Sequence, residues 1–121
     1  MDYRVIVAGS RHFNNYKMLC ERLDRILSEK LKTHNVIIVS GMARGADNMG
    51  ERYARERKLL VHRYPAEWDK YGKSAGHKRN RQMAENADAC VAFWANGSRG
   101  TASMIKIATE LALDLRTIKI D

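Results

Sequence analysis

Two kinds of hydrophobic pattern alternate along the chain. Five short apolar runs are separated by segments in which apolar residues recur every three or four positions. The first pattern is typical of strands buried on both faces of a parallel sheet, and the second is typical of amphipathic helices. The predicted strands are residues 3–8, 35–39, 59–64, 89–94 and 115–120.

The intervening segments predict helices at residues 47–58 and 78–86 and from about residue 102 onward. A further single helix is expected from an Asn14 or Asn15 cap to about residue 31, and residues 65–76 are expected to form a loop. Such alternation favours one three-layer α/β domain spanning residues 1–121, with helices on both faces of a mostly parallel five-stranded sheet. The expected strand order is 3-2-1-4-5.

Composition agrees with a globular domain of this size. The 121 residues are 45% hydrophobic and 30% charged, and no apolar run is long enough to span a bilayer. No apolar leader precedes the first predicted strand, so the sequence favours a cytoplasmic protein without membrane contact. Cys20 and Cys90 lie in apolar patterns and are expected to be reduced.

Three loops that follow predicted strands each contain a glycine and an arginine. In an open parallel sheet, the strand carboxyl ends beside the change in strand order form the usual ligand crevice. Glycines let the backbone approach a ligand, and helix N-termini favour anions. We therefore expect a phosphate-bearing ligand at these loops. The candidate residues are Gly9, Ser10, Arg11, Ser40, Gly41, Arg44, Gly45, Asp47, Ser98, Arg99, Gly100 and Thr101.

The sequence lacks the motifs of several common phosphate-, dinucleotide- and metal-binding sites. Ala46 follows Gly45, so there is no Gly-Lys-Ser/Thr P-loop, and no G-x-G-x-x-G follows the first strand. The four histidines lack metal-ligand spacing, so neither a metal site nor a cofactor is expected. Asp47 is interpreted first as a helix N-cap. The alternative is a functional role, either binding of a ribose hydroxyl or action as a general base.

A basic segment follows the third strand. The net charge is +8, and Lys70, Lys73, Lys78, Arg79 and Arg81 fall within twelve residues of one another. Trp68 stands beside them in a polar segment, where a large aromatic is hard to explain by packing alone. This combination favours an anionic partner and leaves single-stranded nucleic acid as an alternative.

The motifs resemble those of the YspA-like, cpYpsA-related branch of the SLOG superfamily. The match runs in order through Val-Ile-Val-Ala-Gly-Ser-Arg at 5–11, Ser-Gly-Met-Ala-Arg-Gly-Ala-Asp at 40–47, Trp68 with the following Lys-Tyr-Gly-Lys-Ser-Ala-Gly, Arg79-Asn80, and residues 98–101. The resemblance implies a Rossmann-like fold and binding of nucleotides or nucleotide-derived ligands. It adds Trp68, Lys73, Arg79 and Asn80 to the candidate binding residues.

A more distant similarity concerns the Lonely Guy phosphoribohydrolases, which carry H-x-R-K-x-x-M and P-G-G-x-G-T-x-x-E motifs. Residues 77–83 resemble the first motif, with Arg79 on its arginine, and residues 97–101 resemble the second. Met104, however, stands where that family has its catalytic glutamate. Because a methionine can neither take a proton nor stabilise an oxocarbenium ion, catalysis would need another carboxylate, Asp47 or Glu67.

These observations predict a domain that binds a nucleotide or an ADP-ribose-like ligand as a sensor, carrier or sequestering protein. Two alternatives stay open: hydrolysis of an N-glycosidic or phosphoester bond in a nucleotide, and binding of single-stranded nucleic acid. The abundance of apolar residues and the superfamily resemblance also predict a homodimer.

Overall fold

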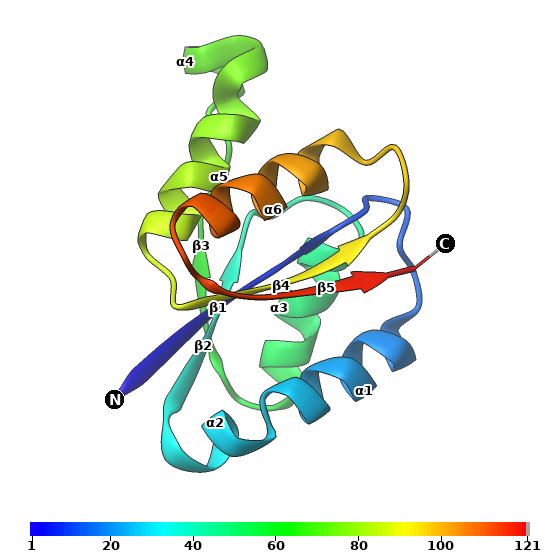
Figure 1. Ribbon diagram of the computed structural model, residues 1–121, viewed down its shortest axis with the longest axis vertical. Helices are drawn as coiled ribbons and strands as arrows, with labels where there is room; N and C mark the ends of the chain where they lie inside the picture. Colours follow the sequence, from blue (N-terminus) through cyan, green and yellow to red (C-terminus); the bar gives the residue numbers. More distant parts are fainter. Residues whose placement is uncertain (121) are drawn as a thin grey trace.

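The computed structural model describes residues 1–120 and contains a five-stranded, all-parallel sheet. The strand order is β3-β2-β1-β4-β5, as predicted (Figure 1). The elements in chain order are β1 (Asp2–Gly9), α1 (Tyr16–Ile26), α2 (Ser28–Thr33), β2 (Asn35–Ser40), α3 (Ala46–Glu56), β3 (Leu60–Arg63), α4 (Trp68–Tyr71), the 3₁₀ turn η1 (Gly72–Ser74), α5 (Ala75–Glu85), β4 (Ala89–Trp94), α6 (Arg99–Glu110) and β5 (Asp114–Lys119).

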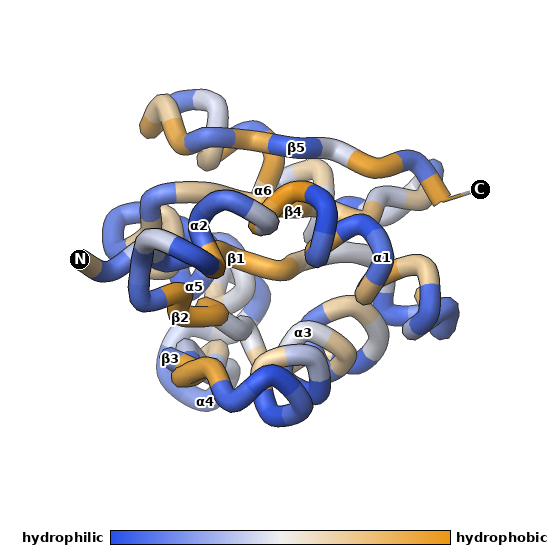
Figure 2. Tube along the Cα trace, turned by 90° about the horizontal axis from the view of Figure 1, so that it is seen from below, coloured by the Kyte–Doolittle hydropathy of each residue, from blue (hydrophilic) through white to orange (hydrophobic). Residues whose placement is uncertain are grey.

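Helices cover both faces of the sheet. On one face, α3 packs against β1 and β2 and also contacts α1; on the other, α6 packs against β4, β1 and β5 and contacts α5 (Figure 1). The middle parts of the central strands β1 and β2 are apolar and buried, as expected for strands covered on both sides (Figure 2). This is a doubly wound α/β fold in which β1 and β4 flank the change in strand order.

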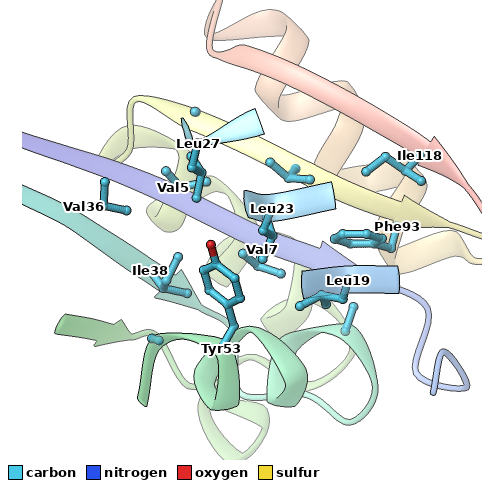
Figure 3. Close-up of a cluster of buried hydrophobic side chains, with 14 of the residues drawn as sticks. Val5, Val7, Leu19, Leu23, Leu27, Val36, Ile38, Tyr53, Phe93 and Ile118 are labelled. Carbon is cyan, nitrogen blue, oxygen red and sulfur yellow. The ribbon is translucent and has the colours of Figure 1, made fainter. Parts of the chain in front are cut away.

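Two hydrophobic clusters hold the layers together. Alternate residues of each strand point to opposite faces, so Val5 and Val7 meet Leu19, Leu23 and Tyr53 on one side (Figure 3). On the other side, Ile6 and Ala8 pack with Met83, Met104 and Ile107. The strand ends that carry the polar loops are therefore fixed from both faces.

The prediction of one continuous first helix is wrong. It begins at the Asn15 cap, whose side chain accepts a hydrogen bond from the Met18 amide, but α1 ends at Ile26 and α2 begins at Ser28. The amide of Leu31 still donates to the carbonyl of Leu27 across the break. Because the apolar spacing continues through the break, the pattern contains no sign of it.

The expected loop at residues 65–76 is also wrong. Helix α4 and the turn η1 occupy residues 68–74 of it, and α5 begins at Ala75 rather than at residue 78. Gly72, with φ +56°, is the C-cap residue of α4 and the first residue of η1, and the Ser74 hydroxyl donates to the Tyr71 carbonyl. These elements are too short for a periodic apolar stripe to predict them.

Candidate functional site

A cleft of about 480 Å³ opens at the carboxyl ends of β1 and β4. This is where an open α/β sheet of this strand order places ligands. Its lining residues come from the end of β1, from the loops after β1, β2 and β4, and from α3, α5 and α6. They are Ala8, Gly9, Ser10, Arg11, His12, Ala43, Asp47, Arg79, Asn80, Met83, Ala95, Asn96, Gly97, Ser98, Arg99, Gly100, Thr101 and Met104.

Close backbone packing brings the first two loops together. A Cβ on Gly9 would lie 2.4 Å from the carbonyl oxygen of Phe93, and the Ser10 amide donates to that same carbonyl at 3.0 Å. Gly45 has φ +77°, and a Cβ there would lie 2.2 Å from the Ser10 carbonyl oxygen. Only glycine tolerates both the positive φ and the close approach of the Ser10 carbonyl at position 45. Side chains at Gly9 and Gly45 would therefore push apart the backbone segments that pack beside the cleft.

Arg79 on α5 reaches across the cleft to the second loop. Its Nη1 donates a hydrogen bond to the carbonyl of Gly41, and its Nε donates to Oδ1 of Asn80 at 3.0 Å. Buried Asn80 in turn donates to the carbonyl of Gly100 at 3.4 Å. Arg79 and Asn80 therefore connect the loop after β2 with the start of α6.

Arg79 keeps a charge that no carboxylate neutralises by direct contact. Within residues 1–120 it has no ion pair closer than 4.0 Å. Partial burial lowers the pKa of Arg79, the nearby Arg11 lowers it further, and Asp47 acts in the opposite direction. An arginine held this way provides a preorganised cation for an incoming anion.

The start of α6 provides a second attraction for an anion. Ser98 is the N-cap residue, but its hydroxyl pairs with the Thr101 hydroxyl at 2.7 Å and caps no backbone amide. The first amides of the helix lack intrahelical partners, and the helix dipole is positive there. Arg99 and Gly100 lie exposed at this end, beside the cleft.

Among residues 1–120, Asp47 is the one acidic residue that lines the cleft, and it is 6% exposed. The prediction that it caps α3 is wrong: Gly45 is the N-cap residue, and Asp47 sits in the first turn. Its carboxylate accepts a hydrogen bond from the Ala43 amide at 3.4 Å. Burial raises the pKa of Asp47 to about 6, although the amides of Ala43 and Gly41 and the charge of Arg79 favour its ionised form. Sequence reasoning could not have detected this burial.

Ten of the sixteen predicted binding residues line the cleft. These are Gly9, Ser10, Arg11, Asp47, Arg79, Asn80, Ser98, Arg99, Gly100 and Thr101. His12 and Met83 also line it and were not predicted, although His12 directly follows Arg11 in the sequence. Met104 lies buried against the cleft, so the position of the Lonely Guy glutamate is apolar here.

The other predicted residues lie outside the cleft lining. Ser40 donates to Glu51 at 2.7 Å and accepts from the Met42 amide, while Gly41 provides the carbonyl for Arg79. Arg44 is exposed, and Gly45 shapes the backbone. Trp68 and Lys73 lie on the surface of α4 and η1, and Glu67 lines a separate pocket of about 270 Å³.

Metal-binding clusters and membrane-spanning helices are both absent from residues 1–120. No three or more His, Cys, Asp or Glu side chains come together there in a way that would hold a metal ion. No helix in this part of the chain has the length and apolar character that crossing a membrane requires.

Comparison with known proteins agrees with this fold and loop arrangement. The model of the YspA, cpYpsA-related SLOG family matches residues 3–71, and a curated relative, the Gene 61 protein of Mycobacterium phage D29, is 32% identical over 118 residues, covering 91% of each chain. The fold and loops define a Rossmann-like domain of the SLOG type. The chain belongs to the YspA, cpYpsA-related SLOG family.

Two solved structures share the fold at low sequence identity. DNA processing protein A from Streptococcus pneumoniae superposes with a TM-score of 0.74 at 19% identity, over 99% of this chain. The corresponding protein from Helicobacter pylori, solved to describe its single-stranded DNA binding mode, gives 0.68 at 19% identity over 95% of this chain. The chain spans 51% and 64% of those two chains, respectively.

Proposed function

We propose that the chain binds a nucleotide or nucleotide-derived ligand, with a phosphate seated between Arg79, Arg99 and the N-terminus of α6. One observation carries this proposal: Arg79, fixed by Gly41 and Asn80, lines the same cleft as the start of α6, whose first amides no side chain caps, and no carboxylate of residues 1–120 forms an ion pair with it. A charged acceptor that contacts both groups gains charge-assisted hydrogen bonds and a favourable helix dipole.

The size and lining of the cleft support a nucleotide rather than a free phosphate ion. Its volume of about 480 Å³ lies in the range of small-molecule sites. Apolar groups at Ala8, Met83 and Met104 and polar groups at Ser10 and Thr101 contribute to one cavity. An ADP-ribose-like ligand has phosphates, hydroxyls and a ring system that match this mixture.

A thermal-shift screen tests the proposal, because a ligand that binds only the folded state raises the melting temperature. The screen compares mononucleotides, dinucleotides, cyclic dinucleotides and ADP-ribose derivatives with inorganic phosphate as the reference. We expect at least one nucleotide-type compound to raise the melting temperature beyond inorganic phosphate. Equal, negligible shifts for all compounds would contradict the proposal.

The environment of Asp47 supports a second candidate function, hydrolysis of an N-glycosidic or phosphoester bond. A buried carboxyl group with a pKa of about 6 inside the cleft is suited to proton transfer near neutral pH. Glu67, the other candidate, lines the separate pocket.

Incubation of the protein with the ligand found in the screen, followed by chromatography, distinguishes hydrolysis from binding. A hydrolase releases base or phosphate at a rate that Asp47→Asn abolishes while the ligand still binds. A sensor, carrier or sequestering protein returns the ligand intact. Single-stranded nucleic acid is the remaining alternative, supported by the net charge of +8 and by the fold shared with DNA processing protein A.

A further inference from the structure

A short segment projects from the body of the molecule and does not line the cleft. We call this segment, residues 68–78, the arm; it contains α4, η1 and the first turn of α5 (Figure 1). The main contacts of α4 are with η1 and α5 and not with the sheet. The arm nevertheless carries Trp68, which is 50% exposed, and Tyr71, which is 37% exposed.

The two aromatic rings are held in place although they face solvent. A Cβ on Gly76 would lie 3.4 Å from the far edge of the Trp68 ring, so the indole packs over the start of α5. The Nζ atoms of Lys70 and Lys78 lie 5.1 and 4.9 Å from the centre of the Tyr71 ring. Exposed rings with fixed positions and adjacent cations can stack on flat ring systems at little entropic cost.

The charges on the arm are unbalanced. Within residues 1–120, Lys70, Lys73 and Lys78 form no ion pair, and Asp69 is the only acidic residue on the arm. Some arginines elsewhere in the chain do pair with an acid, as Arg57 does with Asp24. The arm therefore presents free positive charge next to exposed aromatic rings.

The arm is continuous with the cleft. The separate pocket of about 270 Å³ is lined by Pro65, Glu67, Tyr71, Ala75, Lys78, Arg79 and Gln82, so its one carboxylate, that of Glu67, faces two cationic side chains. Arg79 also lines the cleft, so this one side chain borders both cavities. Trp68 packs at Gly76, three residues before Arg79, about one turn away along α5. A ligand that extends from the cleft past Arg79 would therefore enter the pocket lined by Tyr71 and Lys78.

We propose that the arm and the 270 Å³ pocket bind single-stranded nucleic acid, one of whose phosphates occupies the cleft. Bases stack on Tyr71 and Trp68, and Lys70, Lys73 and Lys78 contact the phosphates between them. Alternation of stacking rings and cations is the usual basis of binding to single strands without strong sequence preference. This inference rests on the proposed function, because it extends the phosphate site in the cleft to a ligand of several nucleotides.

A second copy of the chain fits this surface less well. A two-fold interface places the same patch of both subunits face to face. The unpaired lysines of the arm would then oppose one another, which is unfavourable for association. A negatively charged strand with flat bases complements both the charge and the rings.

The chain contains two tryptophans, which allows a direct test. In a Trp94→Phe background, Trp68 is the sole indole, and stacking of a base on it quenches its emission. Because Trp94 Nε1 has no hydrogen-bond partner within residues 1–120, this background variant removes no side-chain hydrogen bond of the described chain. We expect oligothymidylates to quench Trp68 fluorescence, with affinity rising with length up to roughly four or more nucleotides. Thymidine monophosphate is the single-nucleotide reference.

Fluorescence anisotropy with a labelled oligothymidylate gives a second measurement in the otherwise unchanged chain. Trp68→Ala should weaken oligonucleotide binding about fivefold or more. Lys73→Ala should reduce the slope of log affinity against log salt by about 0.7. Lys32→Ala, on α2, is the matched charge control and should leave binding unchanged. None of these substitutions should alter binding of a mononucleotide to the cleft.

The outcomes separate this inference from the proposed function. Parent-like oligonucleotide binding by both Trp68→Ala and Lys73→Ala would overturn the role of the arm. Loss of self-association by Trp68→Ala, with oligonucleotide affinity unchanged, would identify a protein interface and also overturn it. A dinucleotide that binds as tightly as longer strands would overturn the extended path. Failure of the proposed function is recognised separately, by mononucleotide binding that does not respond to Arg79→Ala.

Discussion

Arg79 donates a hydrogen bond to the carbonyl of Gly41, a residue 38 positions earlier in the chain. The contact joins α5 on one face of the sheet to the loop that follows β2. A Cβ on Gly41 would lie 2.9 Å from Nη1 of Arg79 and 2.8 Å from Oδ2 of Asp47. Gly41 therefore provides both the acceptor and the space that position Arg79 and Asp47 in the same part of the site.

Gly45 is predicted to be essential for the loop packing. Gly45→Ala should reduce the free energy of unfolding by at least about 2 kcal/mol, because alanine disfavours a positive φ and its Cβ would overlap the Ser10 carbonyl. Urea unfolding monitored by circular dichroism measures the change.

Gly100→Ala is the matched control for that measurement. No atom of the described residues, other than those of its own helix and chain neighbours, lies within 4 Å of a Cβ added at Gly100, which lies in the first turn of α6. Alanine should therefore leave stability unchanged or raise it by up to about 1 kcal/mol. Equal destabilisation by the two substitutions would contradict the packing described for Gly45.

Asp47 is predicted to make stability depend on pH. Its pKa is raised in the folded state from 3.8 to about 6, so the folded state holds this proton more tightly than the unfolded state. The stabilisation that results is complete below about pH 4 and is lost as pH rises through about 6. At pH 7, Asp47→Asn should therefore be more stable than the parent by about 2–3 kcal/mol.

Chemical unfolding of both proteins at several pH values checks this expectation. The advantage of the Asp47→Asn variant should shrink toward zero as pH falls to about 4, where Asp47 of the folded parent is itself neutral. A stability difference that stays constant from pH 4 to pH 7 would show that Asp47 does not titrate in this range.

A homodimer remains a prediction from the sequence. The structure gives one concrete place to test it: β3 is an edge strand, and its first residue, Leu60, is 59% exposed. Multi-angle light scattering should give about twice the chain mass of 13.9 kDa. Leu60→Lys should shift the protein toward the monomer by placing a charge on the edge strand. A single monomer mass at high micromolar concentration would refute the dimer.

Much of the fold could be predicted because apolar runs determine a parallel sheet. The strand at 89–94 has the observed bounds, and the observed strand order is the expected one, although the alternation of strands and helices is also compatible with other doubly wound orders. The break at Leu27 and the helix α4 were missed for opposite reasons. At Leu27 the apolar spacing continues through the break, whereas α4, with four residues, is too short to show any spacing.

The candidate site was only partly predictable. The loops after β1 and β4 reach the cleft because parallel strands deliver their carboxyl ends to one edge of the sheet. The contacts of Arg79 depend on residues far away in sequence, which no local pattern specifies. The burial of Asp47 likewise arises only once the loops have packed together, since a carboxylate in a first helical turn is ordinarily exposed.

The central claim is that Arg79 and Arg99 hold one phosphate in the cleft. A charge-assisted hydrogen bond contributes roughly 1.5–3 kcal/mol, so Arg79→Ala and Arg99→Ala should each weaken binding about tenfold or more. Because the two side chains would serve the same group, their effects should not add in the double variant. Lys17→Ala, on the exposed surface of α1, is the charge control and should bind like the parent.

Isothermal titration calorimetry of these four variants and the parent, with the nucleotide found in the thermal-shift screen, tests that claim most directly. The account predicts at least about tenfold weaker binding for each arginine variant and a double variant weakened by less than the product of the two. Parent-like affinity in both single arginine variants would contradict it and place the ligand outside the cleft.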